Sequence, residues 1–274
     1  MKIDSHQHFW IYNDEEYGWI PEDIIRKDFL PADLNPLLAA NGFDGAVAVQ
    51  ARQNEEETDW LLKLAEENGI VKGVVGWIDL RAANVAERIS HYKSHSKLSG
   101  FRHVVQDEPD DRFMLRPDFL NGIQELVRAG IPYDILIFPK HLGVSLELVQ
   151  KFPDHDFVID HIAKPDIKNG EIENWARGIC AFKNFENVRC KLSGMITETH
   201  FNQWQPQDFH PYLDVVFDTF GPSRLMIGSD WPVCLLSGQY GPMMNIVKDY
   251  ILELSTDEQD DILGKTACDF YRLN

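Results

Sequence analysis

Two histidines stand two positions apart near the start of the chain, at His6 and His8. They follow Ile3 in a stretch that we expect to be a strand, and because strand side chains alternate between two faces, both imidazoles point the same way. Two converging neutral imidazoles can bind a divalent cation or polarise a carbonyl group. The pattern is weak alone, but His161 and Asp230 also stand where predicted strands end. Together these four side chains predict an enzyme site.

Short apolar segments alternate with helical stretches along the whole chain. Eight strands are expected, roughly thirty residues apart, which is the length of a strand–helix unit; they lie at 2–5, 45–50, 71–80, 100–104, 132–138, 157–160, 188–192 and 224–228. Helices are expected at 34–41, 58–68, 84–94, 117–129, 144–152, 175–185, 209–220 and 243–254. Gly42, Gly69 and Gly130 are expected to end helices in the left-handed conformation. A last helix is expected to begin at Ser255, where Glu258 completes a capping box.

This alternation predicts an α/β fold, a single (β/α)8 TIM barrel forming one domain over residues 1–274. An open doubly wound sheet is the alternative, but no strand is followed by Gly-x-Gly-x-x-Gly. The connection at 9–36 far exceeds the usual length of about 2–6 residues. Its aromatic residues, among them Trp10, Tyr17 and Trp19, either plug one end of the barrel or fold over its mouth, with Trp19 as a stacking wall. We therefore expect an extended loop after the first strand and an extra C-terminal helix.

Composition excludes several classes of function. The net charge of −18 argues against binding nucleic acid or an anionic membrane surface. The four cysteines show no C-x-x-C spacing, which is more typical of a reducing compartment than of a disulfide framework. No signal peptide and no long apolar run are visible, so we expect a cytoplasmic protein.

Active sites of such barrels lie at the carboxyl ends of the strands. Most of these ends carry a polar or ionisable side chain, and a buried polar group is costly unless it is paired. A purely structural barrel would need few of them, so the ring indicates a catalytic site. Read in order, the ends carry His6 and His8, Gln50, Asp79, Arg102 with His103, Phe138, His161, Ser193 and Asp230.

Five motifs in order resemble the amidohydrolase superfamily, specifically its amidohydrolase-2-type lactonase branch. They are Asp4-Ser5-His6-Gln7-His8-Phe9, Gly100-Phe101-Arg102-His103, Asp160-His161-Ile162-Ala163-Lys164-Pro165, Lys191-Leu192-Ser193-Gly194-Met195 and Gly228-Ser229-Asp230-Trp231-Pro232-Val233. The resemblance runs from the first strand to the last helix and implies a hydrolase. Known relatives open lactones of sugar acids or of aromatic breakdown products such as pyrone dicarboxylate. One departure is Thr266, where the family usually has Asn.

The resemblance also bears on metal. Binuclear superfamily members have a lysine or glutamate after strand four and a histidine after strand five, whereas this chain has Arg102-His103 and Ile137-Phe138-Pro139. Two metals are therefore not expected. His6, His8, His161 and Asp230 could hold one zinc-type cation. Some relatives work without metal, so a metal-independent enzyme stays open.

The expected roles follow from this resemblance and from side-chain chemistry. Asp230 would act as general base toward water, unless it only caps the following turn. The three histidines would stabilise charge on the carbonyl oxygen, although His161 could instead be a core residue paired with Asp160.

Several further side chains are candidate substrate contacts. Arg102 could bind a carboxylate or hydroxyl, or form a structural ion pair. His103 could assist or simply face a helix. Gln50 and Trp19 would contact substrate, and Lys164 could face it, although a solvated loop lysine is the usual case.

The predicted substrate is a neutral aldonolactone, such as L-fucono- or L-rhamnonolactone, which would place the enzyme in carbohydrate metabolism. Arg102 is the single arginine at the strand ends, whereas a dicarboxylate would call for several. The alternatives are a pyrone dicarboxylate-type lactonase, a metal-dependent decarboxylase of the same superfamily, and a binding protein that has lost the chemistry.

Overall fold

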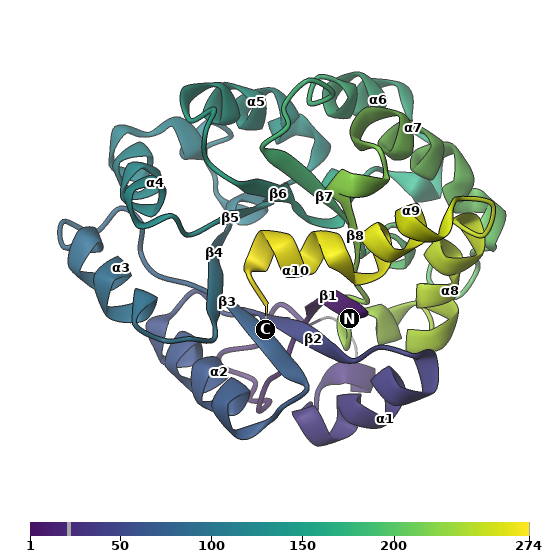
Figure 1. Ribbon diagram of the computed structural model, residues 1–274, viewed down its shortest axis with the longest axis horizontal. Helices are drawn as coiled ribbons and strands as arrows, with labels where there is room; N and C mark the ends of the chain where they lie inside the picture. The colour runs from purple at the N-terminus through teal and green to yellow at the C-terminus, as the bar shows by residue number, and fades with distance from the viewer. Residues whose placement is uncertain (21–22, 274) are drawn as a thin grey trace.

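The computed structural model describes residues 1–20 and 23–273. Eight parallel strands follow one another in the sheet in chain order, each paired with the next. They are β1 (Ile3–Gln7), β2 (Gly45–Val49), β3 (Val71–Gly76), β4 (Leu98–Val104), β5 (Tyr133–Leu136), β6 (Phe157–Ile159), β7 (Val188–Leu192) and β8 (Leu225–Ile227). Figure 1 looks along the axis around which they are arranged. The predicted TIM barrel is confirmed.

Eight helices form a ring outside the strands (Figure 1). They are α1 (Pro31–Asn41), α2 (Glu55–Glu67), α3 (Val85–Lys93), α4 (Pro117–Ala129), α5 (Leu142–Lys151), α6 (Glu173–Cys180), α7 (His210–Phe220) and α8 (Tyr240–Tyr250). Helix α4 shows why they form where they do. Pro117 occupies its first turn, Phe119, Ile123 and Leu126 are buried on one face, and Gly130 ends it in the left-handed conformation with φ of 67°.

The ring closes where β1 meets β8, and this seam is built differently from the other strand contacts. Within the described residues, no ladder joins the two strands, and one parallel bridge links Gln7 to Trp231. Backbone hydrogen bonds from His8 N to Trp231 O (2.6 Å) and from Asp230 N to His6 O (2.7 Å) complete the contact. The predicted catalytic residues therefore lie on both sides of this seam.

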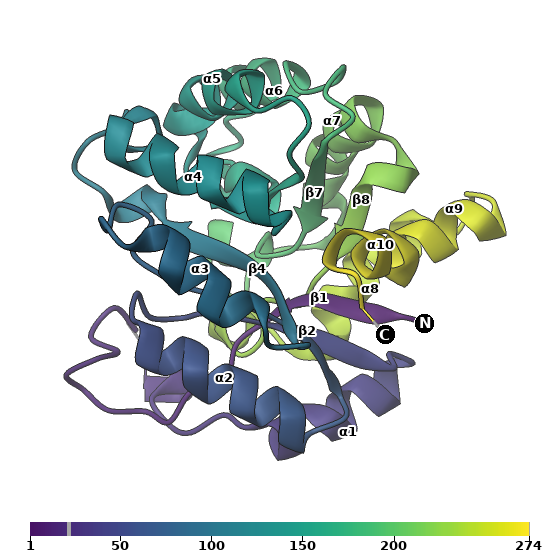
Figure 2. The same ribbon diagram turned by 60° about the vertical axis from the view of Figure 1, so that its left-hand side comes forward.

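The C-terminal segment covers the amino-terminal end of the barrel (Figures 1 and 2). The predicted capping box is confirmed, because Ser255 caps α9 (Thr256–Asp260) together with Glu258. The expected single helix is instead two, because a π-turn (Asp261–Lys265) separates α9 from α10 (Thr266–Tyr271). Helix α10 packs on interior side chains in a cluster defined by Ile3, Val47, Val49, Val75, Val158, Met226, Ala267, Phe270 and Tyr271.

The long connection after β1 has both buried and exposed aromatic side chains. Trp10 and Tyr17 are buried and pack against each other, with Phe29 on the other side of Trp10. Trp19 remains 47% exposed. The buried aromatics therefore anchor the loop, while Trp19 is left at its surface.

Two sequence expectations are wrong in detail. The third strand ends at Gly76, and Asp79 belongs to the following loop, where its carboxylate accepts a hydrogen bond from Arg81. Gly69 does not end α2 in the left-handed conformation, because the helix ends at Glu67 and the capping residue Asn68 is extended. Among the described residues, no helix is long and apolar enough to cross a membrane.

Candidate active site

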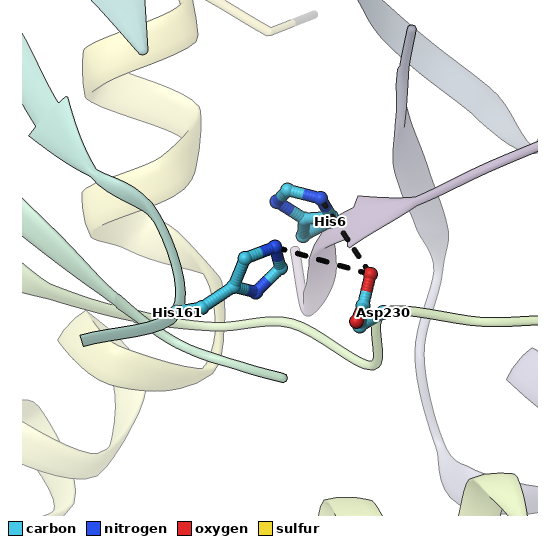
Figure 3. A group of neighbouring side chains, drawn as sticks. All are labelled: His6, His161 and Asp230. Carbon is cyan, nitrogen blue, oxygen red and sulfur yellow. Dashed lines mark ion pairs between the residues drawn. The ribbon is translucent and has the colours of Figure 1, made fainter. Parts of the chain in front are cut away.

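The four predicted donors come together at the carboxyl end of the barrel. Figure 3 shows the rings of His6 and His161 facing the Asp230 carboxylate. Asp230 Oδ1 lies 3.8 Å from His6 Nε2, 4.0 Å from His161 Nε2 and 3.3 Å from His8 Nε2. His6 Nε2 and His8 Nε2 are 3.3 Å apart, as expected for two residues on one face of a strand. All four side chains are buried.

Backbone geometry aims two of these side chains. Asp230 has φ of 54°, and His161 begins a run of four left-handed residues that ends at Lys164. Such a conformation is disfavoured for residues other than glycine. Gly194 lets the His161 ring approach, since a Cβ at Gly194 would lie 2.5 Å from His161 Nδ1. The chain thus accepts backbone strain to point His161 and Asp230 inward.

Hydrogen bonds fix the rings of His8 and His161. The Nδ1 of His8 lies 2.8 Å from the Val49 carbonyl oxygen, which can only accept, so in the neutral ring the proton is on Nδ1 and Nε2 carries a lone pair. The Nδ1 of His161 is 2.9 Å from Ser193 Oγ. Asp160 does not serve as the partner of His161, because its carboxylate pairs with Arg102 and Lys191.

Burial sets the charges in the site. It lowers the pKa of His161 to about 4, and it lowers the pKa of His6 well below its ordinary value, where the charge of Lys191 adds to the effect. Burial alone would raise the pKa of Asp230, but interactions with His161, His8 and His6 outweigh it and the pKa is lowered. Near neutral pH an ionised carboxylate therefore faces neutral imidazoles.

This donor set fits a divalent cation. Zinc binds nitrogen and carboxylate oxygen at about 2.0–2.2 Å, which brings neighbouring donors to about 3.3 Å from each other. Donor atoms of His6, His161 and Asp230 lie within 4.8 Å of one another, and His8 Nε2 lies beside the same carboxylate oxygen. Three nitrogens and one oxygen match the expected mononuclear type.

A buried ion-pair cluster lies beneath His6. Lys191 contacts Asp134 and Asp160, and Asp160 also accepts a hydrogen bond from Arg102 (3.0 Å). The sequence prediction named Arg102 but missed Lys191 and Asp134. Both residues could have been found, because strands of a parallel barrel are buried on both faces. A charged residue inside such a strand therefore indicates a buried ion pair.

A pocket of about 590 Å³ opens above the cluster. Of the predicted residues, His8, Trp19, Arg102, His161, Lys164 and Asp230 line it. Two further lining residues, Arg52 and Glu16, were missed; their side chains form an ion pair between the loops after β2 and β1. No strand-end position marks Arg52, which follows β2 by three residues.

The other predicted residues, His6, Gln50 and His103, lie nearby but do not line this pocket. Gln50 is buried beside Arg102, whose Nη2 donates to the Gln50 carbonyl oxygen. His103 is within 2.6 Å of Glu108 and stacks on Phe113, so it faces the surrounding helical layer, which is the alternative that its sequence position allowed.

Comparisons with known proteins identify the family of the chain. The amidohydrolase family model matches residues 3–273. An L-fucono-1,5-lactonase of Burkholderia multivorans is 37% identical over 100% of this chain and 96% of its own. An L-rhamnono-gamma-lactonase of Scheffersomyces stipitis is 26% identical over 57% of this chain and 54% of its own. A crystal structure of a Burkholderia multivorans amidohydrolase with bound zinc superimposes with a TM-score of 0.96, at 37% identity and with 100% of both chains covered. The chain therefore belongs to the amidohydrolase family.

Proposed function

We propose that this protein hydrolyses the lactone of a sugar acid, with Asp230 as the general base. The observation that carries the proposal is a buried Asp230 carboxylate that lies 3.3–4.0 Å from the ring nitrogens of three histidines and lines a polar pocket. The similarity to lactonases over the full chain supports the substrate class.

In the proposed mechanism, Asp230 takes a proton from water as that water attacks the lactone carbonyl carbon. His6 and His161 can present an N–H toward the developing negative charge on the carbonyl oxygen and stabilise it, whereas His8, whose Nε2 carries a lone pair, would act on this charge through a bound cation. When the carbon–oxygen bond of the ring breaks, Asp230 returns the proton to the leaving oxygen. The product is the open-chain aldonic acid, which ionises near neutral pH to the aldonate and releases one proton.

We propose that His6, His8, His161 and Asp230 can also hold one divalent cation of zinc type. Such a cation would polarise the carbonyl group and lower the pKa of a bound water.

The pocket favours a neutral, hydroxyl-rich substrate. It contains more cationic side chains than the strand ends alone predicted, but Arg102 is neutralised by Asp160 and Arg52 by Glu16. Both arginines are therefore already paired with a carboxylate of the protein, and neither is free to pair with a dicarboxylate substrate. We propose Trp19 as a stacking wall for the sugar ring, Lys164 and Arg102 as hydrogen-bond donors, and Gln50 as a support for Arg102. A deoxy sugar acid lactone, such as L-fucono- or L-rhamnonolactone, is the proposed substrate.

Proton release followed with a pH indicator tests the proposal. We expect rapid acid production from one stereochemical group of 1,5- or 1,4-aldonolactones and none from pyrone dicarboxylate. Asp230→Asn protein provides the rate of spontaneous opening. Carbon dioxide release from hydroxybenzoates, with no lactone opening, would instead identify the decarboxylase.

A further inference from the structure

Lys191 places a fully buried ammonium group directly beneath His6. It lies on β7, and its side chain has no exposure. Its Nζ is 2.6 Å from Asp134 Oδ2, 2.9 Å from Asp160 Oδ1 and 3.2 Å from His6 Nδ1. An ammonium has three N–H donors and no acceptor. Nζ donates a hydrogen bond to Asp134 Oδ2 and meets hydrogen-bond geometry with His6 Nδ1, whereas its contact with Asp160 Oδ1 is an ion pair.

His6 Nδ1 has two competing neighbours. Lys191 can only donate to it, whereas Asp160 Oδ1, at 3.5 Å, can only accept from it. If Lys191 donates, the single proton of the neutral ring is on Nε2. If Asp160 accepts, the proton is on Nδ1 and Nε2 carries the lone pair that a cation would need.

Two hydrogen-bond patterns meet these distances. In the first, Lys191 donates to His6 Nδ1, and His6 Nε2–H donates to the lone pair of His8 Nε2 at 3.3 Å. In the second, Arg102 Nη1 donates to His6 Nε2 at 3.2 Å, and His6 Nδ1–H faces Asp160.

The two patterns differ in which donor they leave without an acceptor. The second leaves one N–H of Lys191 unpaired in a fully buried place, and such a donor costs about 1–3 kcal/mol. The first leaves an N–H of Arg102 free, but Arg102 lines the pocket and can reach water or substrate there. The accounting of buried donors therefore favours the first pattern.

We propose that Lys191 is a positioning residue that keeps the proton of His6 on Nε2. His6 is then a hydrogen-bond donor toward His8, which lines the pocket, and cation binding at Nε2 must overcome both this proton and the nearby ammonium charge. This inference rests on the proposed placement of the catalytic centre at His6. The affinity of the site for a divalent cation would then depend on Lys191.

Zinc affinity of the metal-free protein tests this inference through a charge-balanced change. Lys191→Met together with Asp134→Asn removes one positive and one negative charge. The amide oxygen introduced at position 134 can still accept from Tyr271, whose hydroxyl donates to Asp134 at 2.6 Å. We expect zinc to bind at least about tenfold more tightly, measured by competition with a chromogenic chelator. Structural damage to the site would weaken zinc binding. Tighter zinc binding by the double variant would therefore distinguish loss of the ammonium group from structural damage. Unchanged or weaker affinity in folded protein would overturn the inference.

The matched control makes the same two substitutions in an exposed ion pair. Lys140 and Asp111 are 2.6 Å apart on the surface, and Lys140→Met with Asp111→Asn is expected to leave zinc affinity unchanged.

A second measurement uses the unaltered protein and holds even if the double variant does not fold. Two-bond ¹H–¹⁵N spectra report which ring nitrogen is protonated, and loss of one signal set in His6→Gln assigns it. We expect a protonated Nε2; a protonated Nδ1 would overturn the inference. Neither readout requires lactone hydrolysis, so either can fail without touching the proposed activity.

Discussion

The two ends of the barrel are made from the same strands and are built in opposite ways. At the amino-terminal end, α10 contributes Phe270 to a cluster of mostly apolar side chains and covers strand residues such as Val47 and Val158. At the carboxyl end, polar side chains converge, His161 and Asp230 adopt left-handed backbone angles, and the pocket stays open. Stability and chemistry are therefore separated along the barrel axis, with the buried ion pairs of Lys191 between them.

The largest expected effect is at the open end. Asp230→Asn removes the proposed base, and we expect kcat/KM to fall by about 10³-fold, or roughly 4 kcal/mol of transition-state stabilisation. The urea midpoint should stay close to that of the wild type. The matched control is Asp79→Asn, which changes a carboxylate in the loop after β3 and should keep full activity. Near-normal turnover by the Asp230 variant would remove it from the mechanism.

The next effect belongs to the closed end. Phe270→Ala deletes a ring that is 3% exposed, and we expect a loss of about 3 kcal/mol in the free energy of unfolding, with kcat/KM of the folded protein within twofold. Urea unfolding and initial rates measure the two quantities. Phe201→Ala, at a side chain that is 39% exposed, is the control and should lose little stability. If activity falls in step with stability, the two ends are not separable.

A smaller expected effect concerns the pH dependence of stability and comes from Glu57, which supports a loop at the open end. Glu57 is buried and accepts hydrogen bonds from Ala51 N and Arg52 N, which shapes the loop after β2. Burial raises its pKa to about 7, above the value of 4.5 expected in the unfolded chain. The folded state therefore holds this proton more tightly, and the resulting stability is full below pH 4.5 and lost as the pH rises through about 7.

Glu57→Gln keeps the acceptor and removes the titration. Relative to the variant, we expect the wild type to lose up to about 3 kcal/mol of unfolding free energy between about pH 5 and pH 8. Urea titrations at several pH values measure this difference. Glu258→Gln, at an exposed capping residue, should show no such loss. Parallel pH curves for wild type and the Glu57 variant would contradict the expectation.

Much of the site could be predicted because it follows local rules. A period of two places His6 and His8 on one face, and parallel strands bring His161 and Asp230 to the same end. The same period explains His103, because neighbouring strand residues face opposite ways and Arg102 takes the interior.

What could not be predicted depends on long-range contacts or unusual backbone. The carboxylates around Lys191 come from other strands, and no periodic pattern pairs them with it. The left-handed run from His161 to Lys164 contains no glycine that would mark it. The single domain and the cytoplasmic location remain predictions from the sequence.

The seam between β1 and β8 has a mechanical consequence. The contact between β1 and β8 has the fewest backbone pairings of any strand contact in the described barrel. His6 and His8 lie on the β1 side of this contact, and Asp230 lies on the β8 side. A lactone bound between these residues would contact both the first strand and the segment after the last strand. We therefore expect a bound lactone to add contacts across the joint where the fewest backbone hydrogen bonds hold the barrel closed.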